Sequence, residues 1–126
     1  MNIPNDLFYS KEHTWVRIEN NIGTIGITDF AQSELGEIVY ADVPNVGYNF
    51  KQDEVFGSVE AIKTVSDLFM PLSGKVLETN KLLLKEPTLV NSEPFENGWM
   101  IKIEIENSQE IENLLTAEQY ANLTNR

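Results

Sequence analysis

Residues 58–69 read SVEAIKTVSDLF, two short apolar runs that meet at a lysine and a threonine. Runs rich in β-branched and aromatic residues favour strands. Because Lys63 and Thr64 stand where one run ends and the next begins, we predict a hairpin with Lys63 at its exposed tip. The loop has no Asn-Gly pair, so a type I turn within a slightly longer loop fits the residues better than a two-residue type I′ turn.

Further strand-like segments, separated by turn residues, lie on both sides of this hairpin. The predicted strands cover residues 14–19, 24–28, 38–43, 75–78 and 99–106. A short helix is expected between Thr28 as its cap and Gly36 as its end, and a C-terminal helix from the capping-box spacing of Thr116 and Gln119. Residues 79–98 are predicted to form a loop with a short helical turn. These elements predict a mainly β fold, a small sandwich or partly closed barrel with short helices. The large aromatic residues expected in the core or in a cleft wall are Trp15, Trp99, Phe30 and Phe56.

Length and charge limit the possible functions. The chain of 126 residues, 41% hydrophobic, has room for one compact domain, residues 1–126. Its formal charge of -11 disfavours nucleic acid and anionic membranes as partners. The same field favours partners that present a basic surface.

Cysteine and histidine are scarce in this chain. The sequence has no cysteine, which excludes disulfides, thiolate metal sites and a cysteine nucleophile. His13 is the one histidine, so a site with several histidine ligands is excluded and we expect no metal centre. The amino terminus, MNIPNDLFYS, has neither a signal-peptide nor a transit-peptide pattern, and no apolar run is long enough to span a bilayer. We therefore expect a cytoplasmic protein.

Several blocks of the sequence resemble one known family. The string VEAIKTVSDLFMPLSGKV is similar to the lysine-bearing hairpin of glycine cleavage system H proteins, whose family pattern is E-S-V-K-A-x-S-D. In the same order, the family is also matched by KEHTWVR, GTIGITDFAQSELGEIVYADVPNVG, LVNSEPFENGWMIKI and LLTAEQY. The resemblance covers essentially the whole chain.

This resemblance implies a fold of the lipoyl-domain type, two antiparallel sheets packed as a flattened barrel or sandwich. It implies that lipoate is attached to Lys63 by an amide bond, through a lipoate-attaching enzyme. Such carriers shuttle the aminomethyl group of glycine from glycine decarboxylase, a pyridoxal phosphate enzyme, to an aminomethyltransferase that uses tetrahydrofolate. Dihydrolipoyl dehydrogenase then reoxidises the dithiol. The carrier itself catalyses nothing, and we expect a monomer.

The family also indicates which residues shelter the loaded arm. Acidic and polar groups of the histidine-containing segment and of the lysine hairpin serve this purpose, which points to Glu12, His13, Thr14 and Asp67. Many members have an acidic residue directly after the histidine, where this chain has Thr14. If the segment is extended, strand alternation places Glu12 on the same side as Thr14. Glu60 and Asp67 are the candidates for recognition by the attaching enzyme.

Three other functions compete with this interpretation. A biotinyl or dehydrogenase-type lipoyl domain is one, although biotinyl domains usually flank their lysine with methionine and here the neighbours are Ile62 and Thr64. The second is a protein that stores or relays lipoyl groups for 2-oxo acid dehydrogenases. The third is a hydrolase that uses His13, but no serine or cysteine nucleophile stands in a recognisable partner motif.

Overall fold

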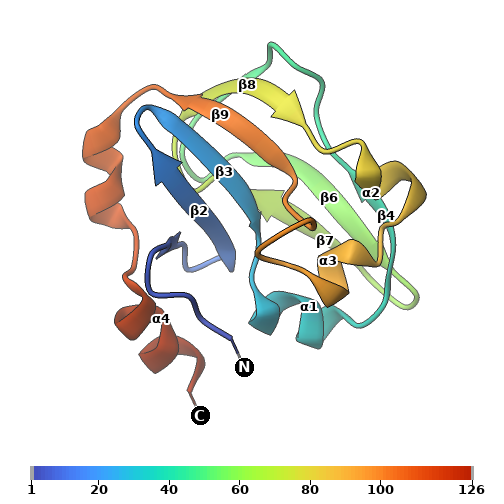
Figure 1. Ribbon diagram of the computed structural model, residues 1–126. Helices are drawn as coiled ribbons and strands as arrows, with labels where there is room; N and C mark the ends of the chain where they lie inside the picture. Colours follow the sequence, from blue (N-terminus) through green and yellow to red (C-terminus); the bar gives the residue numbers. More distant parts are fainter. Residues whose placement is uncertain (1, 126) are drawn as a thin grey trace.

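Two antiparallel β-sheets face each other across the centre of the molecule (Figure 1). The computed structural model describes residues 2–125. The strands are β1 Phe8–Tyr9, β2 Thr14–Glu19, β3 Ile22–Ile27, β4 Ile38–Asp42, β5 Asn49–Phe50, β6 Val55–Ala61, β7 Val65–Phe69, β8 Gly74–Thr79 and β9 Ile101–Ile105. The six-stranded sheet has the order β1-β2-β3-β9-β8-β5, and the three-stranded sheet has the order β4-β6-β7. The sheets form a flattened sandwich, which confirms the predicted fold class.

Short helices lie around this sandwich (Figure 1). They are α1 Asp29–Leu35, α2 Leu82–Lys85, α3 Leu89–Ser92, the 3-10 helix η1 Ser108–Asn113 and α4 Ala117–Thr124. The predicted ends of α1 are confirmed: the Thr28 hydroxyl accepts the Ala31 N–H, and Gly36 ends the helix with a φ of 83°. The capping box of Thr116 and Gln119 is also formed at the start of α4.

Some elements have no signal in the sequence. β1 and β5 contain two residues each, too few for an alternating pattern, and they are ordered by antiparallel pairing with β2 and β8. The predicted loop over residues 79–98 contains the two helices α2 and α3. The chain reverses between β2 and β3 at Asn20, which has a φ of 57°, and Gly23 lies inside β3 opposite Ile103.

Two apolar clusters stabilise the fold on the two faces of the six-stranded sheet. The larger lies between the sheets and contains Val16 and Ile25. The smaller contains Trp15, which packs on Phe95, and the α4 residue Tyr120. Because β2 alternates Val16 into one cluster and Trp15 into the other, both faces of this strand are buried where it begins.

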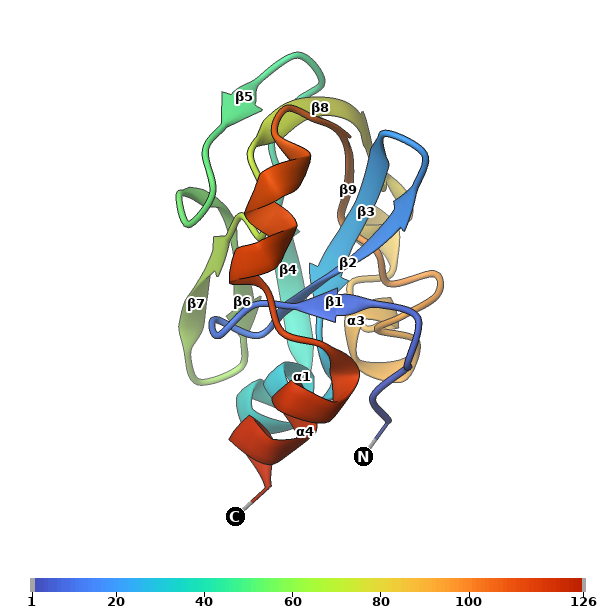
Figure 2. The same cartoon turned by 90° about the vertical axis from the view of Figure 1, so that its left-hand side faces the viewer.

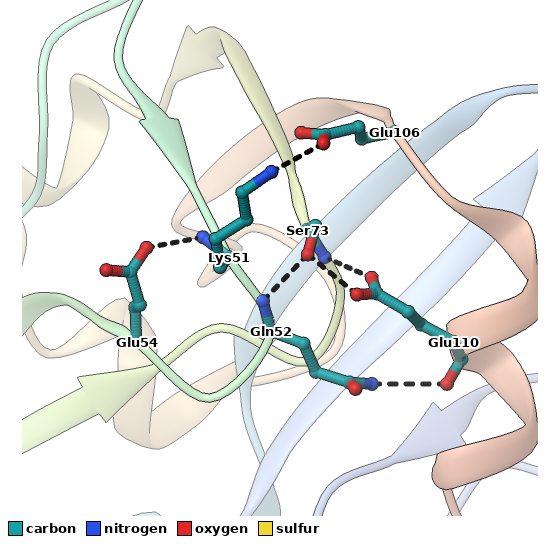
Figure 3. A network of polar contacts seen from close by, with 6 residues as sticks. All are labelled: Lys51, Gln52, Glu54, Ser73, Glu106 and Glu110. Atoms are coloured by element: carbon teal, nitrogen blue, oxygen red, sulfur yellow. Dashed lines mark hydrogen bonds and ion pairs between the residues drawn. The ribbon is translucent and has the colours of Figure 1, made fainter.

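A polar network holds the base of the β6–β7 hairpin (Figure 3). The Glu110 carboxylate of η1 accepts the Ser73 backbone N–H and the Ser73 hydroxyl, each at 2.8 Å. The Ser73 hydroxyl in turn accepts the backbone N–H of Gln52, at 2.8 Å. Beside it, the Lys51 ammonium lies 2.6 Å from a carboxylate oxygen of Glu106, whose hydrogen bond and charge raise the pKa of Lys51. The network therefore joins η1 to the two chain segments that flank the hairpin.

Candidate functional site

The β6–β7 hairpin ends in a short loop, residues 62–64. The Ala61 N–H donates to the Thr64 carbonyl at 2.8 Å, and Glu60 pairs with Val65 just before it. Among residues 2–125, left-handed φ values outside glycine occur at three positions, none of them in this loop. A type I′ turn is therefore absent, as the residues predict, because that turn needs positive φ at both central positions.

The hairpin is supported along the outer edge of β6 and from inside, while β7 is the edge strand of its sheet. β6 pairs with β7 on one side and with β4 on the other, where Ile38 lies opposite Ala61. Val59 and Leu68 are buried in the core between the sheets. The loop is therefore carried by paired strands almost to its tip, which limits its motion.

Lys63 lies at this tip and is exposed. Across the part of the chain that the structure describes, its ammonium makes no ion pair and no hydrogen bond. Its neighbours are also uncovered, since Ile62 is 68% exposed and Val65 is 64% exposed. An amine in this position is open to an acylating enzyme.

A cleft of about 290 Å³ lies beside the hairpin, between the two sheets and α1. Figure 2 shows the β6–β7 loop and α1 at the same end of the molecule. The cleft brings together four residues singled out in the sequence: Glu12, His13, Thr14 and Asp67. Its remaining lining residues are Ile27, Phe30, Ala31, Glu34, Leu35, Val59, Ser66 and Leu68.

His13 enters this cleft from the turn between β1 and β2. Its φ of 69° lies in the left-handed region, where residues other than glycine are uncommon. Two backbone hydrogen bonds hold this conformation, from His13 N–H to the Ser10 carbonyl and from Thr28 N–H to the His13 carbonyl, each 3.1 Å long. The imidazole lies against the Phe30 ring, with 4.8 Å between ring centroids.

Thr14 is the first residue of β2 and its side chain is used inside the protein. It is 1% exposed, and its hydroxyl donates to the Phe69 carbonyl at 3.1 Å. The segment from Glu12 to Thr14 is not extended, because the chain turns at His13 before the strand starts, so strand alternation does not relate the two side chains. Glu12 and Thr14 nevertheless line the same cleft.

The cleft combines carboxylates with an apolar wall. Its acidic residues are Glu12, Glu34 and Asp67, and the lining residues include neither lysine nor arginine. Phe30 and Leu35 of α1 contribute apolar surface. Such a cleft favours a ligand that has an ammonium group on an apolar chain, because carboxylates attract the cation while the wall covers the chain.

Glu60 lies outside this cleft. It is exposed in β6, between Tyr40 of β4 and Val65 of β7, which pair with it on the two sides. Since directly opposed residues point to the same face of a sheet, Glu60 lies on a surface that it shares with Tyr40 and Val65. Tyr40 is 49% exposed there.

Several cleft residues were not identified from the sequence as site residues. Glu34 and Leu35 belong to the predicted helix. Their spacing from Phe30 and Ala31 puts all four residues on one helical face, so the sequence did indicate a face that could line a site. The sequence did not say which sheet that face meets. Tyr120 was predicted in the C-terminal helix, but nothing local indicated that its hydroxyl lies 2.7 Å from the His13 imidazole.

Residues 2–125 contain neither a metal-binding cluster nor a membrane-spanning helix. No group of three or more histidine, cysteine, aspartate or glutamate side chains is arranged to hold a metal ion. None of the helices in this range combines the length and the apolar character that crossing a membrane requires.

Comparisons with known proteins agree with one another. The family model described as glycine cleavage H-protein matches residues 7–126. A glycine cleavage system H protein of Bacillus cereus (strain AH187) is 54% identical over 126 residues, which cover 100% of this chain and 99% of the relative. The corresponding protein of Bacillus mycoides (strain KBAB4) is 53% identical over the same length.

The fold is also similar to a solved structure. The crystal structure of a glycine cleavage system H protein from Mycobacterium marinum aligns with a TM-score of 0.85 at 32% sequence identity. The alignment covers 95% of this chain and 97% of that protein.

Proposed function

The chain belongs to the glycine cleavage H-protein family, and we propose that it is the lipoyl carrier of a glycine cleavage system, with Lys63 as the attachment residue. In this role it carries the aminomethyl group of glycine from glycine decarboxylase to an aminomethyltransferase. The family match favours this function over a biotinyl carrier. The chain is proposed to act as one carrier domain, residues 1–126, with no catalytic activity of its own.

The exposed amine of Lys63 is the observation that carries this proposal. Acylation needs a lysine that the attaching enzyme can reach, and Lys63 has neither an ion-pair partner nor a covering side chain within residues 2–125. The paired strands on both sides of β6 hold the amine in a defined position. Glu60 and Asp67 lie on the same hairpin, and we propose that the attaching enzyme recognises them.

The residues around the cleft fit the group that such a carrier holds. Lipoate supplies a disulfide that opens to accept the aminomethyl group and closes again after reoxidation. Glu12 and Asp67 provide negative charge for the ammonium of the carried group, and His13 and Thr14 complete this wall. Asp67 is four residues after Lys63, roughly 13 Å along the strand, so the arm has to fold back along β7 to reach it.

The proposed partners follow from this role. They are the pyridoxal phosphate enzyme glycine decarboxylase, the tetrahydrofolate-dependent aminomethyltransferase, dihydrolipoyl dehydrogenase and a lipoate-attaching enzyme. A formal charge of -11 suits partners with basic docking surfaces. We further propose that the carrier is monomeric and works in the cytoplasm.

Intact mass spectrometry after co-expression with a lipoate ligase tests the attachment residue. We expect the wild-type chain to gain the mass of one lipoyl group. Lys63→Arg should gain nothing although it keeps the positive charge, because a guanidinium does not form the amide. Lys75→Arg is the matched control, since Lys75 is another exposed lysine on a strand, and it should be modified as fully as wild type.

Either of two results would reject the proposal. One is a wild-type chain whose mass does not change in the presence of an active ligase. The other is a Lys63→Arg variant that still gains a lipoyl group, which would place the attachment elsewhere.

A further inference from the structure

The C-terminal helix α4 brings a buried tyrosine to the back of the cleft. Tyr120 is 0% exposed, and its ring stacks on the ring of Tyr9 with 4.7 Å between centroids and 11° between planes. Its ring also meets the His13 imidazole edge-on, with centroids 5.7 Å apart. Tyr120 is absent from the lining of the cleft but contacts a residue that lines it.

The hydroxyl of Tyr120 joins two elements that form the cleft. It lies 2.7 Å from Nδ1 of His13 and 2.7 Å from the hydroxyl of Thr28. Thr28 is the N-cap of α1 and accepts the Ala31 N–H at 3.1 Å. Since His13 and Ala31 both line the cleft, this one hydroxyl connects the β1–β2 turn to the start of α1.

This chain of three side chains is satisfied in either of two proton arrangements. In the first, Tyr120 donates to an unprotonated Nδ1 of His13, and Thr28 donates to Tyr120. In the second, a protonated Nδ1 donates to Tyr120, and Tyr120 donates to Thr28. Burial raises the pKa of Tyr120 to about 12, so the phenol keeps the proton that both arrangements need.

The backbone conformation of His13 also helps to hold its imidazole in place. Its left-handed conformation is unfavourable for a residue other than glycine and persists only where the surroundings hold it. Backbone hydrogen bonds to Ser10 and from Thr28 hold the peptide groups, and Tyr120 holds the ring. The side chain therefore meets the cleft in one orientation.

We propose that Tyr120 is a positioning residue for the cleft, and that its hydroxyl sets the orientation of the His13 imidazole and the distance between His13 and α1. The inference rests on the proposed carrier function, because it takes the cleft to be the place that receives the lipoyl arm. It assigns the C-terminal helix a role in arm binding although no residue of α4 lines the cleft.

Tyr120→Phe tests this proposal, because it removes the hydroxyl and keeps the ring that stacks on Tyr9. Tyr9→Phe is the matched control: Tyr9 is equally buried, belongs to the same stack, and donates its hydroxyl to the Pro4 carbonyl at 2.6 Å. The first readout is the ¹⁵N NMR spectrum of the imidazole in the unmodified chain. The chain has one histidine, so its signals need no assignment.

We expect Tyr120→Phe to shift the Nδ1 and Nε2 signals of His13 and Tyr9→Phe to leave them in place. In the lipoyl-modified chain, Tyr120→Phe should raise KM for the aminomethyltransferase by about fivefold, the factor expected for one lost hydrogen bond, with little change in kcat. Thermal unfolding of both variants shows whether a general loss of stability accounts for the difference.

The proposal is overturned if the His13 signals of Tyr120→Phe equal those of wild type, or if Tyr9→Phe shifts them as strongly. A failure of the carrier function itself has a different signature, a wild-type chain that is not lipoylated at Lys63. The NMR measurement uses the unmodified chain and is unaffected by that result.

Discussion

Thr14 lines the cleft and at the same time connects the two sheets. Its hydroxyl donates a hydrogen bond to the carbonyl of Phe69, the last residue of β7. Because that hydrogen is used, the 2.7 Å contact with Ser10 has the Ser10 hydroxyl as donor. The Thr14 hydroxyl therefore makes its hydrogen bonds inside the protein. The negative charge of the cleft comes from Glu12, Glu34 and Asp67.

Replacing Thr14 by valine should lower the free energy of unfolding by about 1–3 kcal/mol, because the Phe69 carbonyl and the Ser10 hydroxyl each lose a buried partner. Urea unfolding measures the change. Thr24→Val is the matched control, since Thr24 is a buried strand threonine whose hydroxyl makes no hydrogen bond to the described residues. That control should stay within about 0.5 kcal/mol of wild type. Equal losses in the two variants would contradict the role given to Thr14.

At the scale of elements, the β6–β7 hairpin depends on close contact with β4. The pairing of β6 with β7 shifts register between Val55 and Gly57, which marks a bulge. A Cβ at Gly57 would collide with the carbonyl oxygen of Asp42 and would touch Val43 Cα at 3.5 Å. Glycine at this position lets the β4 backbone approach, so β4 can support the hairpin that carries Lys63.

Gly57→Ala should destabilise the protein by roughly 1–3 kcal/mol, the usual cost of forcing an extra group into a packed site. We expect amide hydrogen exchange to become faster at Tyr40, Ala41 and Asp42, where β4 meets β6. Ser58→Ala is the control in the same strand and removes atoms without adding any, so its β4 amides should exchange as in wild type. Unchanged exchange in Gly57→Ala would mean that β4 is not displaced.

At the scale of the whole molecule, the acidic charge and the exposed hairpin act together. The chain carries 20 acidic and 9 basic residues. Around the tip, exposed Glu60 lies beside the exposed apolar side chains of Tyr40, Ile62 and Val65. A partner that docks here would match both features, with basic residues around an apolar centre.

Salt should therefore weaken docking. Between about 0.05 M and about 0.3 M NaCl, we expect KM of the lipoylated chain for glycine decarboxylase to rise severalfold with kcat nearly constant, because ions screen long-range attraction. Glu60→Lys should raise KM more than Glu118→Lys, which makes the same change of net charge on α4, away from the hairpin. A KM that does not depend on salt, or equal effects of the two variants, would argue against docking at this surface.

Local signals explain which parts of the fold could be predicted. The hairpin around Lys63, the capped ends of α1 and the capping box of α4 are encoded within a few neighbouring residues each, and the structure contains all of them. The pairs β1–β2 and β5–β8 were not predicted, because a two-residue strand has no pattern of its own and exists only beside its partner.

The residues of the candidate site also fall into two groups, those that local sequence identifies and those that only the tertiary structure reveals. Motif residues such as Lys63, His13 and Asp67 could be named from the sequence, because each stands at a fixed place in a short family pattern. Glu34 and Tyr120 could not, since their relation to the cleft arises from how α1 and α4 pack. The turn between Glu12 and Thr14 could not be predicted, because the left-handed φ of His13 depends on hydrogen bonds to Ser10 and from Thr28.

The sequence alone determined the mainly β fold, the family, the acidic surface and the lysine at a hairpin tip. All of these depend on composition or on residues that are neighbours in the chain. Tertiary structure decided that the turn before β2, the helix α1 and the hairpin enclose one cleft, and that a tyrosine 107 positions away from His13 contacts its ring. The physical reason is that such contacts form only when distant segments bury their apolar faces together, so no single segment encodes them.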